Sequence, residues 1–384
     1  MHGESALVDI TSENIQNELR KIEELLRPYD PVDIMNFGED VTDLFFKYRN
    51  RIVDIINNSK HGIFLENRVI EIIGHFHMLF LVPGQSSDIQ KSIFSEVLLN
   101  ELHNNQVRYF MMKTLKPAGD IYLKLSNIVY DIEEENISIM KGVLMLTQLA
   151  DTASYYEQRL LIGLARLIEE LPKTRVKNNQ IGEIELWSSY FHPLLSRILS
   201  DNERSVMLRW PDKAALEQSQ GRPDAIISEV TGNGFGISFG FGECKTSDGC
   251  TNASLCKDII KLAQLSQRSI NINSVKSVLC FQIYGFEIVF YIANLSNEGV
   301  YTFSQLAMVE FPRSVEELPK FVNMKTISQL LRVSQCFWNH CYTQEQCPNL
   351  KSKMVQEVDY SALDSFICNK YSVARPCPIK FASL

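Results

Sequence analysis

The sequence predicts a protein that mixes α-helices with β-strands, in which an all-α N-terminal domain precedes an α/β domain built on one sheet. Apolar residues recur at helical spacing from about residue 11 to 171, and short β-prone runs follow the polar, basic segment LPKTRVKNNQIGEIE. The length of 384 residues is also large for a single hydrophobic core. We therefore expect an α-helical domain over 1–175, a second domain over 176–345 and a C-terminal tail over 346–384.

Amphipathic helices account for the first of these domains. The earliest, within NIQNELRKIEELLRPYD, ends near Pro28. Its apolar stripe consists of Ile15, Leu19, Ile22 and Leu26. Similar stretches predict helices over about 41–58, 64–82, 88–104 and 120–171, with few strand signals between them.

The second domain begins with a short helix within IELWSSYFHPLLSRILS. The β-prone runs SVMLRW, RPDAIISEV and GISFGFGECK follow, and Asn233-Gly234 predicts a tight hairpin between the last two. A helix over about 253–270 comes next, and VKSVLCFQIYG and EIVFYIANL then predict two paired strands. The predicted order is therefore helix, three strands, helix and strand, followed by C-terminal helices.

Composition excludes several classes of protein. The most apolar windows, IIGHFHMLFLV and FEIVFYIANL, are shorter than the roughly 20 apolar residues of a membrane span, and the opening residues do not resemble a secretory signal. All nine cysteines lie between Cys244 and Cys377, and this odd number favours reduced thiols over a disulfide framework. The residues favour an intracellular location without distinguishing the nucleus from the cytoplasm.

Charge is distributed unevenly along the chain. The net charge of −8 argues against a protein that coats nucleic acid by bulk attraction. Up to residue 178 there are 19 basic and 26 acidic residues, which leaves 19 basic and 20 acidic residues in the rest. The nearly neutral second part therefore permits a nucleic-acid surface if its charges are arranged locally.

The stretch FGFGECK places an acid and a base on an apolar strand face. Side chains alternate along a strand, so Phe239, Phe241, Glu243 and Lys245 are expected to share one face, with Ser238, Gly240 and the other small residues on the opposite face. Burial of a carboxylate and an ammonium is costly unless each has a partner. A divalent cation is a natural partner for the acid.

A second acid is expected beside the first. Asp224 follows Pro223 at the start of the preceding strand, and the hairpin can bring it next to Glu243 at the end of the antiparallel neighbour. Two carboxylates can hold Mg²⁺ or Mn²⁺, which lowers the pKa of a bound water, while Lys245 stabilises negative charge on a phosphate. Glu183 or Glu185, at the start of the short helix, could supply a third acid, and we prefer Glu185 because it lies further inside that helix.

These residues carry a resemblance to a known family. Pro223-Asp224, followed after a hairpin by Glu243-Cys244-Lys245, resembles the PD-(D/E)xK nuclease superfamily with its restriction-endonuclease-like core. Over about 180–345, RPDAIIS, GECK, CFQIYG and EELPKF also resemble a group of uncharacterised fungal proteins with this core. The resemblance implies a metal-dependent nuclease with Asp224 and Glu243 as metal ligands, Lys245 as the catalytic lysine and an upstream glutamate as an auxiliary ligand. It leaves the helical first half unexplained.

The helix over 253–270 is a candidate for contacts with phosphate. Its polar residues at helical spacing are Lys257, Lys261, Gln264 and Arg268. The resemblance singles out Gln264, because superfamily members often place a glutamine here. The alternative, which is slightly favoured, is an ordinary solvated helix face.

The expected activity is hydrolysis of phosphodiester bonds in nucleic acid, with DNA favoured over RNA, by water activated at Mg²⁺ or Mn²⁺ held by Asp224, Glu243 and Glu185. The alternative is an inactive nuclease-fold module that binds DNA or protein. We expect the N-terminal helices to position substrate, to form a homodimer or to bind a protein partner, and we expect no membrane contact.

Overall fold

The computed structural model describes residues 41–59, 62–111, 115–211, 213–217, 222–248, 250–297, 299–342, 351–352, 354–355, 363–368 and 376–381. The helix predicted within NIQNELRKIEELLRPYD lies outside these residues. No helix within them is both long enough and apolar enough to cross a membrane.

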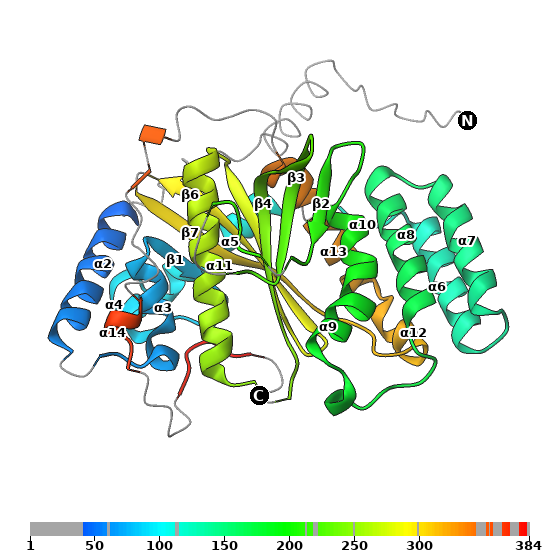
Figure 1. Ribbon diagram of the computed structural model, residues 1–384, viewed down its shortest axis with the longest axis horizontal. Helices are drawn as coiled ribbons and strands as arrows, with labels where there is room; N and C mark the ends of the chain where they lie inside the picture. Colours follow the sequence, from blue (N-terminus) through cyan, green and yellow to red (C-terminus); the bar gives the residue numbers. More distant parts are fainter. Residues whose placement is uncertain are drawn as a thin grey trace, which may run out of the picture.

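A mixed sheet forms the centre of the molecule (Figure 1). Its seven described strands follow the spatial order β1-β7-β6-β5-β4-β3-β2, and the pairs β1·β7 and β4·β5 are parallel while the other pairs are antiparallel. The strands are β1 (Met78–Leu81), β2 (Val206–Arg209), β3 (Ala225–Thr231), β4 (Gly234–Lys245), β5 (Ser277–Tyr284), β6 (Glu287–Asn297) and β7 (Val300–Glu310).

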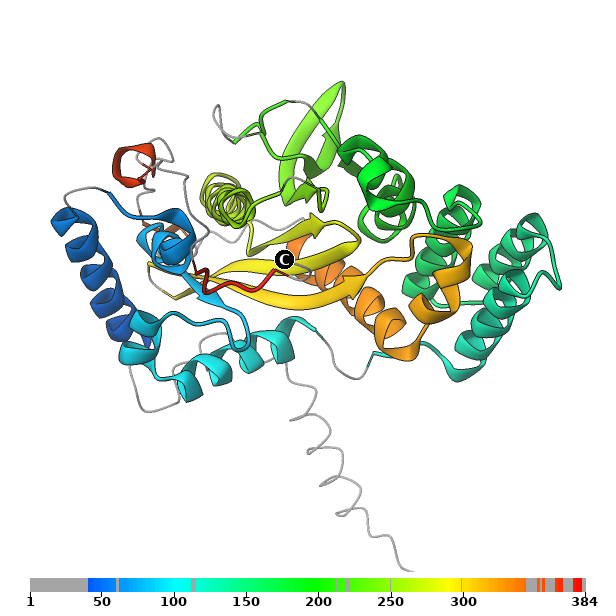
Figure 2. The same cartoon turned by 90° about the horizontal axis from the view of Figure 1, so that it is seen from below.

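Helices flank the sheet at both ends and cover its faces (Figures 1 and 2). Near β1 lie α2 (Val41–Asn58), α3 (Leu65–His75), α4 (Asp88–Phe94) and α5 (Glu96–Phe110). The opposite end carries α6 (Gly119–Glu133), α7 (Ile139–Asp151) and α8 (Tyr155–Glu170). Later come α9 (Glu183–Glu185), the π-helix η3 (Leu186–Phe191), α10 (His192–Leu199), α11 (Asn252–Asn273), α12 (Leu318–Phe321), α13 (Met324–Cys336), the π-helix η5 (Phe337–Cys341) and α14 (Leu363–Phe366).

Helix α11 positions part of the candidate site. It begins after Thr251, where the hydroxyl oxygen of Thr251 accepts a hydrogen bond from the Ser254 amide, and the Ser254 hydroxyl oxygen accepts one from the Thr251 amide. The helix packs on β4, β5, β6 and α3. It ends at Ser274, which adopts a left-handed conformation with φ 56°.

The predicted order of helix, three strands, helix and strand is observed as α10, β2, β3, β4, α11 and β5. The predicted pairing of the last two strands is also confirmed, because β5 and β6 form an antiparallel ladder. The hairpin turn between β3 and β4 consists of Gly232 and Asn233, one residue earlier than predicted, and Gly232 takes the positive φ of 52°. The likeness of this core to restriction endonucleases stays a prediction.

The prediction of an all-α first half is wrong at residues 78–81. The helix expected over 64–82 ends at His75, His77 adopts a φ of 64°, and Met78–Leu81 form β1 beside β7. The four residues of β1 are all buried, and so short an apolar run has no periodicity that separates a strand from a buried helix segment.

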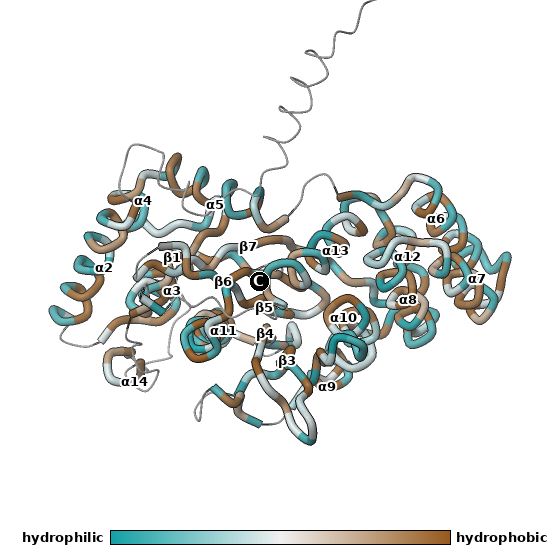
Figure 3. Tube along the Cα trace, turned by 90° about the horizontal axis from the view of Figure 1, so that it is seen from above, coloured by the Kyte–Doolittle hydropathy of each residue, from teal (hydrophilic) through white to brown (hydrophobic). Residues whose placement is uncertain are grey.

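The hydrophobic core crosses the predicted domain boundary at 175. One cluster of buried side chains includes Leu164 and Ile168 of α8 together with Leu194 of α10 and Phe281 of β5. Figure 3 shows that apolar residues concentrate along the central strands, whereas α6 and α7 alternate between apolar and polar residues. The helices of the first half and the sheet of the second half therefore stabilise one another through a shared core.

Candidate functional site

Acidic and basic side chains from four segments meet at one end of β4. Asp224 immediately precedes β3, Glu243 and Lys245 lie near and at the end of β4, and the sequence-predicted trio is therefore brought together. Two residues of α11, Asp258 and Lys261, complete the group together with Glu183 at the start of α9. We call these six residues the acidic cluster.

Strand register explains how Asp224 reaches the cluster. Ala225 pairs with Gly242, so Asp224 lies across from Glu243 as the hairpin predicts. One carboxylate oxygen of Asp224, Oδ2, accepts a hydrogen bond of 2.8 Å from the amide of Cys244 and lies 3.4 Å from Lys245 Nζ. The main chain of β4 thus fixes this carboxylate directly.

The predicted alternation along β4 holds from Phe241 to Lys245 and is interrupted before that. Ile227 pairs with Gly240 while Ser228 pairs with Ser238, which leaves Phe239 as an extra residue in β4. Phe239 packs against the ring of Tyr342. The prediction that Phe239 and Glu243 belong to one uninterrupted row is therefore wrong, because a β-bulge changes the phase of the strand.

The bulge also corrects the predicted orientation of Ser238. Its amide and hydroxyl donate hydrogen bonds of 3.0 and 2.9 Å to the carboxylate of Glu217, and that carboxylate also accepts a hydrogen bond from Asn273 of α11. The carbonyl oxygen of Ser238 accepts a hydrogen bond from Ser269 of the same helix. Residue 238 therefore bonds toward α11, rather than lying with Gly240 on the opposite face.

Glu243 is fully buried, and its carboxylate contacts one ammonium group. Oε1 lies 2.7 Å from Lys261 Nζ, yet neither carboxylate oxygen accepts a hydrogen bond of regular geometry within the described part of the chain. Burial, followed by the neighbouring Asp258 carboxylate, raises the pKa of Glu243 well above its ordinary value. An ionised Glu243 is therefore costly unless a cation compensates for it.

Three carboxylates of the cluster surround the ammonium group of Lys245. Its Nζ lies 3.4 Å from Asp224, 3.6 Å from Glu183 and 4.0 Å from Asp258, and it donates a hydrogen bond of 2.8 Å to the Cys244 carbonyl oxygen. Burial alone would lower the pKa of Lys245, but the surrounding carboxylates, with Asp258 and Asp224 first, raise it above its ordinary value. Lys245 is therefore a fixed positive charge at neutral pH, rather than a base.

Asp258 is the member of the cluster that sequence reasoning missed. Its side chain is 8% exposed, and its two oxygens lie 4.0 Å from Lys245 Nζ and 3.9 Å from Lys261 Nζ. Burial raises the pKa of Asp258 to about 6. A usable signal was present, because Asp258 precedes Lys261 by three residues and therefore shares its side of the helix.

The upstream acid next to Lys245 is Glu183, not the preferred Glu185. Ion pairs of Lys245 with described residues go to Glu183, Asp224 and Asp258, and Glu185 makes none of them. Glu185 is exposed and instead raises the pKa of Tyr190, after the larger effect of burial. The preference for Glu185 is corrected, because it is Glu183, the first residue of α9, whose carboxylate lies 3.6 Å from Lys245 Nζ.

The four predicted phosphate-binding residues of α11 do not form a solvated face. Lys261 points into the acidic cluster, Gln264 is buried, and Arg268 donates a hydrogen bond of 3.0 Å to the carbonyl oxygen of Glu217. Lys257 is half-buried. The prediction of a solvated helix face is therefore wrong, because α11 packs between the sheet and α3 and few of its residues lie outside the core. A contact of these side chains with phosphate stays a prediction.

The carboxylates are of the ligand type that a hard divalent cation prefers, but their positions in the described residues do not form a metal site. Oε2 of Glu243 and Oδ2 of Asp258 are buried without a hydrogen-bond donor, and oxygen ligands of this kind suit Mg²⁺ and Mn²⁺. Within the described residues, however, no group of three or more Asp, Glu, His or Cys side chains is arranged to hold a metal ion. The ammonium groups of Lys245 and Lys261 supply the positive charge among these carboxylates instead.

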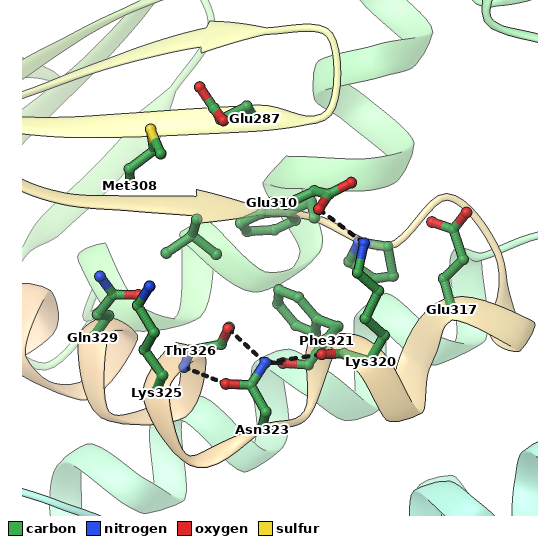
Figure 4. A pocket seen from close by; sticks show the side chains of 13 residues that line it. Glu287, Met308, Glu310, Glu317, Lys320, Phe321, Asn323, Lys325, Thr326 and Gln329 are labelled. Atoms are coloured by element: carbon green, nitrogen blue, oxygen red, sulfur yellow. Dashed lines mark hydrogen bonds and ion pairs between the residues drawn. The ribbon is translucent and has the colours of Figure 1, made fainter. Parts of the chain in front are cut away.

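A separate hollow of about 300 Å³ lies beside the end of β7, against α12 and α13 (Figure 4). Glu287 and Met308 line it from the sheet, while Lys320 is joined to Glu310 by a contact of 3.0 Å. Burial, followed by Glu310, raises the pKa of Glu287 to about 6. The hollow shares no lining residue with the acidic cluster.

Comparison of the chain with models of protein families, with curated proteins and with solved structures finds no match.

Proposed function

We propose that the protein is a metal-dependent hydrolase of phosphodiester bonds in nucleic acid, as the resemblance to PD-(D/E)xK nucleases implies. The observation that carries the proposal is the meeting of Asp224, Glu243 and Lys245 at one end of β4, with the Lys245 ammonium 3.4 Å from the Asp224 carboxylate. Asp258 and Glu183 bring two further carboxylates to the same place.

Each side chain has a role that its surroundings support. Asp224 and Glu243 would hold Mg²⁺ or Mn²⁺, which when bound lowers the pKa of an attacking water and neutralises charge on the phosphate. Lys245 stays protonated, because the carboxylates around it raise its pKa, and it would stabilise the negative charge that develops on the phosphate oxygens. Glu183 and Asp258 would orient the Lys245 ammonium group between them.

A second candidate function is a non-catalytic module that binds DNA or protein. The observation in its favour is the 2.7 Å contact between Lys261 Nζ and Glu243 Oε1, because an ammonium group there already neutralises the acid that a cation would need. Such a module would retain the acidic cluster as a structural ion-pair network.

Cleavage assays separate the two candidates. Purified protein would be incubated with labelled single- and double-stranded DNA and RNA in Mg²⁺, in Mn²⁺ or in a chelator. We expect cation-dependent cleavage that Asp224→Asn and Lys245→Ala each reduce by at least about 100-fold, the scale of losing one preorganised charge.

Matched controls use charged side chains outside the cluster. Asp120→Asn changes an aspartate whose side chain is 70% exposed, and Lys325→Ala changes an exposed lysine of the separate hollow. Both controls should cleave like the unchanged protein. Equal cleavage by all four variants would refute the assignment of the site, and binding without cleavage by the unchanged protein would favour the non-catalytic module.

A further inference from the structure

We infer that Lys261 is an internal counter-ion of the acidic cluster, which neutralises Glu243 when no divalent cation is bound and withdraws when one binds. The inference rests on the proposed metal-dependent function and adds a means of regulating it. The cluster would then exist in two states, one closed by the lysine and one occupied by the cation.

The contacts of Lys261 mark it as a substitute for a bound cation. Its Nζ lies 2.7 Å from Oε1 of the fully buried Glu243 and 3.9 Å from Oδ1 of Asp258, and it donates a hydrogen bond of 3.1 Å to the Arg222 carbonyl oxygen. Two carboxylate oxygens and one carbonyl oxygen around a positive charge form the kind of oxygen shell that hard cations choose.

The two lysines divide the carboxylates between them. Lys245 contacts Glu183, Asp224 and Oδ2 of Asp258, whereas Lys261 contacts Glu243 and Oδ1 of Asp258. Withdrawal of Lys261 would therefore free oxygens of Glu243 and Asp258 next to oxygens of the same residues that already lack a hydrogen-bond donor. Lys245 would keep its place, as its proposed role requires.

Lys261 also has a route out of the cluster. Its side chain is 19% exposed whereas that of Glu243 is 0% exposed, so the lysine reaches the acid from the solvent side. A lysine side chain is flexible and its ammonium group is strongly hydrated, so it can exchange a buried contact for water when a divalent cation takes over the carboxylates.

Direct cation binding tests the inference without any activity measurement. Mn²⁺ would be titrated into the unchanged protein, Lys261→Gln, Lys261→Arg and the control Lys325→Gln, which changes an exposed lysine outside the cluster, with free Mn²⁺ followed by electron paramagnetic resonance. We expect Lys261→Gln to bind Mn²⁺ at least tenfold more tightly, because its competitor is gone, and Lys261→Arg and Lys325→Gln to bind no more tightly than the unchanged protein.

A second measurement needs no substitution and so does not depend on the folding of a variant. Lysines of the unchanged protein would be acetylated briefly with and without Mg²⁺, and the modified peptides quantified by mass spectrometry. We expect Mg²⁺ to increase labelling of Lys261 several-fold and to leave labelling of the exposed Lys325 unchanged.

The outcomes separate the two ideas. Mn²⁺ binding that Lys261→Gln leaves equal or weakens, or labelling of Lys261 that Mg²⁺ does not increase, overturns the role of Lys261 while the metal site stands. Absence of Mn²⁺ binding in the unchanged protein and in Lys261→Gln alike overturns the proposed metal-dependent function, and the role of Lys261 with it.

A different observation carries a second inference, which is independent of the acidic cluster. The Sγ atoms of Cys256 on α11 and Cys377 near the C-terminus lie 3.5 Å apart as free thiols, and we propose that they form a reversible disulfide in the presence of a low-molecular-weight disulfide such as oxidised glutathione. Cys377 is half-buried whereas Cys256 is fully buried, so Cys377 is the first point of attack.

The disulfide between Cys256 and Cys377 would form in two thiol–disulfide exchange steps. The Cys377 thiolate attacks oxidised glutathione, forms a mixed disulfide and releases one glutathione thiolate, and the Cys256 thiol then loses its proton and displaces the second glutathione. One disulfide of glutathione is thereby reduced to two thiols while the protein thiols are oxidised. The new bond would tie residues 376–381 to α11.

Peptide mapping of the intact protein tests this pairing. After treatment with oxidised glutathione, we expect a linked peptide that contains both cysteines, and its loss on addition of dithiothreitol. Cys256→Ser should instead accumulate glutathione on Cys377. A stable mixed disulfide on Cys377 in the unchanged protein, or preferential pairing of either cysteine with another, would overturn the proposal.

Discussion

Replacement of Lys261 by methionine should destabilise the protein strongly, because it removes the ammonium group next to a carboxylate that water cannot reach. Glu243 is 0% exposed, and Lys261 Nζ is the cation nearest to it, at 2.7 Å from Oε1. Loss of one partner of a buried pair typically costs about 3–5 kcal/mol, since it leaves an uncompensated charge in a medium of low polarity. We expect a loss of that size at pH 8 in a chelator.

Proton uptake by Glu243 should reduce this loss at lower pH. Burial and the Asp258 carboxylate raise the pKa of Glu243, so the folded protein protonates Glu243 at a pH where the unfolded chain would not. Below the raised pKa, Glu243 is neutral and the absence of the lysine matters less. The difference in stability between the unchanged protein and Lys261→Met should therefore shrink as the pH falls from 8 to 5.

A double replacement tests whether the pair itself stabilises the fold. Lys261→Met with Glu243→Met removes both charges and fills the site with apolar atoms, which for buried pairs is often neutral or stabilising by about 1–4 kcal/mol. Urea unfolding followed by circular dichroism would measure all variants. A single replacement that costs less than about 1 kcal/mol at pH 8, or a double replacement that costs more than the single one, would refute the reasoning.

Two further predictions concern other parts of the sheet. Gly242→Ala should cost about 1–3 kcal/mol, because its Cβ would lie 2.2 Å from the buried ring of Phe281, whereas Gly119→Ala, with no atom within 4 Å, should change stability by less than about 1 kcal/mol in the same unfolding assay. Burial and Glu310 raise the pKa of Glu287 from 4.5 to about 6, so the folded state binds the proton more tightly and its stability falls as the pH rises through this window. Glu287→Gln should remove that decline, and equal slopes of urea midpoint against pH for the two proteins would contradict this origin.

The sequence predicted the centre of the candidate site, although the observed hairpin alone does not fix its register. Around Gly232 and Asn233 the structure pairs Thr231 with Gly234, so an unbroken ladder would put Asp224 opposite Phe241, and two register shifts between the strands move it to Glu243. The turn predicted one residue later, at Asn233-Gly234, leads to the same pairing without a shift. Strand alternation then keeps Lys245 on the same side as Glu243. Mixed α and β architecture, the hairpin and the helix α11 were all predictable from period and turn chemistry.

The remaining features depend on packing that no local pattern records. The bulge at Phe239 adds one residue to one strand, and nothing in GISFGFGECK distinguishes it from regular alternation. Asp258 becomes part of the cluster only because α11 packs against β4. This packing brings Asp258 next to Lys245. The choice of Glu183 over Glu185 depends on where a single helical turn begins, and helix boundaries are the least predictable part of a sequence.

The pairing of β1 with β7 has a consequence for synthesis of the chain. Met78–Leu81 pair with Tyr301–Ser304, so the partner strand leaves the ribosome more than 200 residues later. At about 5–20 residues per second, the earlier strand waits roughly 10–45 s with its backbone groups unpaired. A nascent chain arrested before residue 300 should therefore remain sensitive to protease around β1 and should recruit chaperones that bind extended apolar segments.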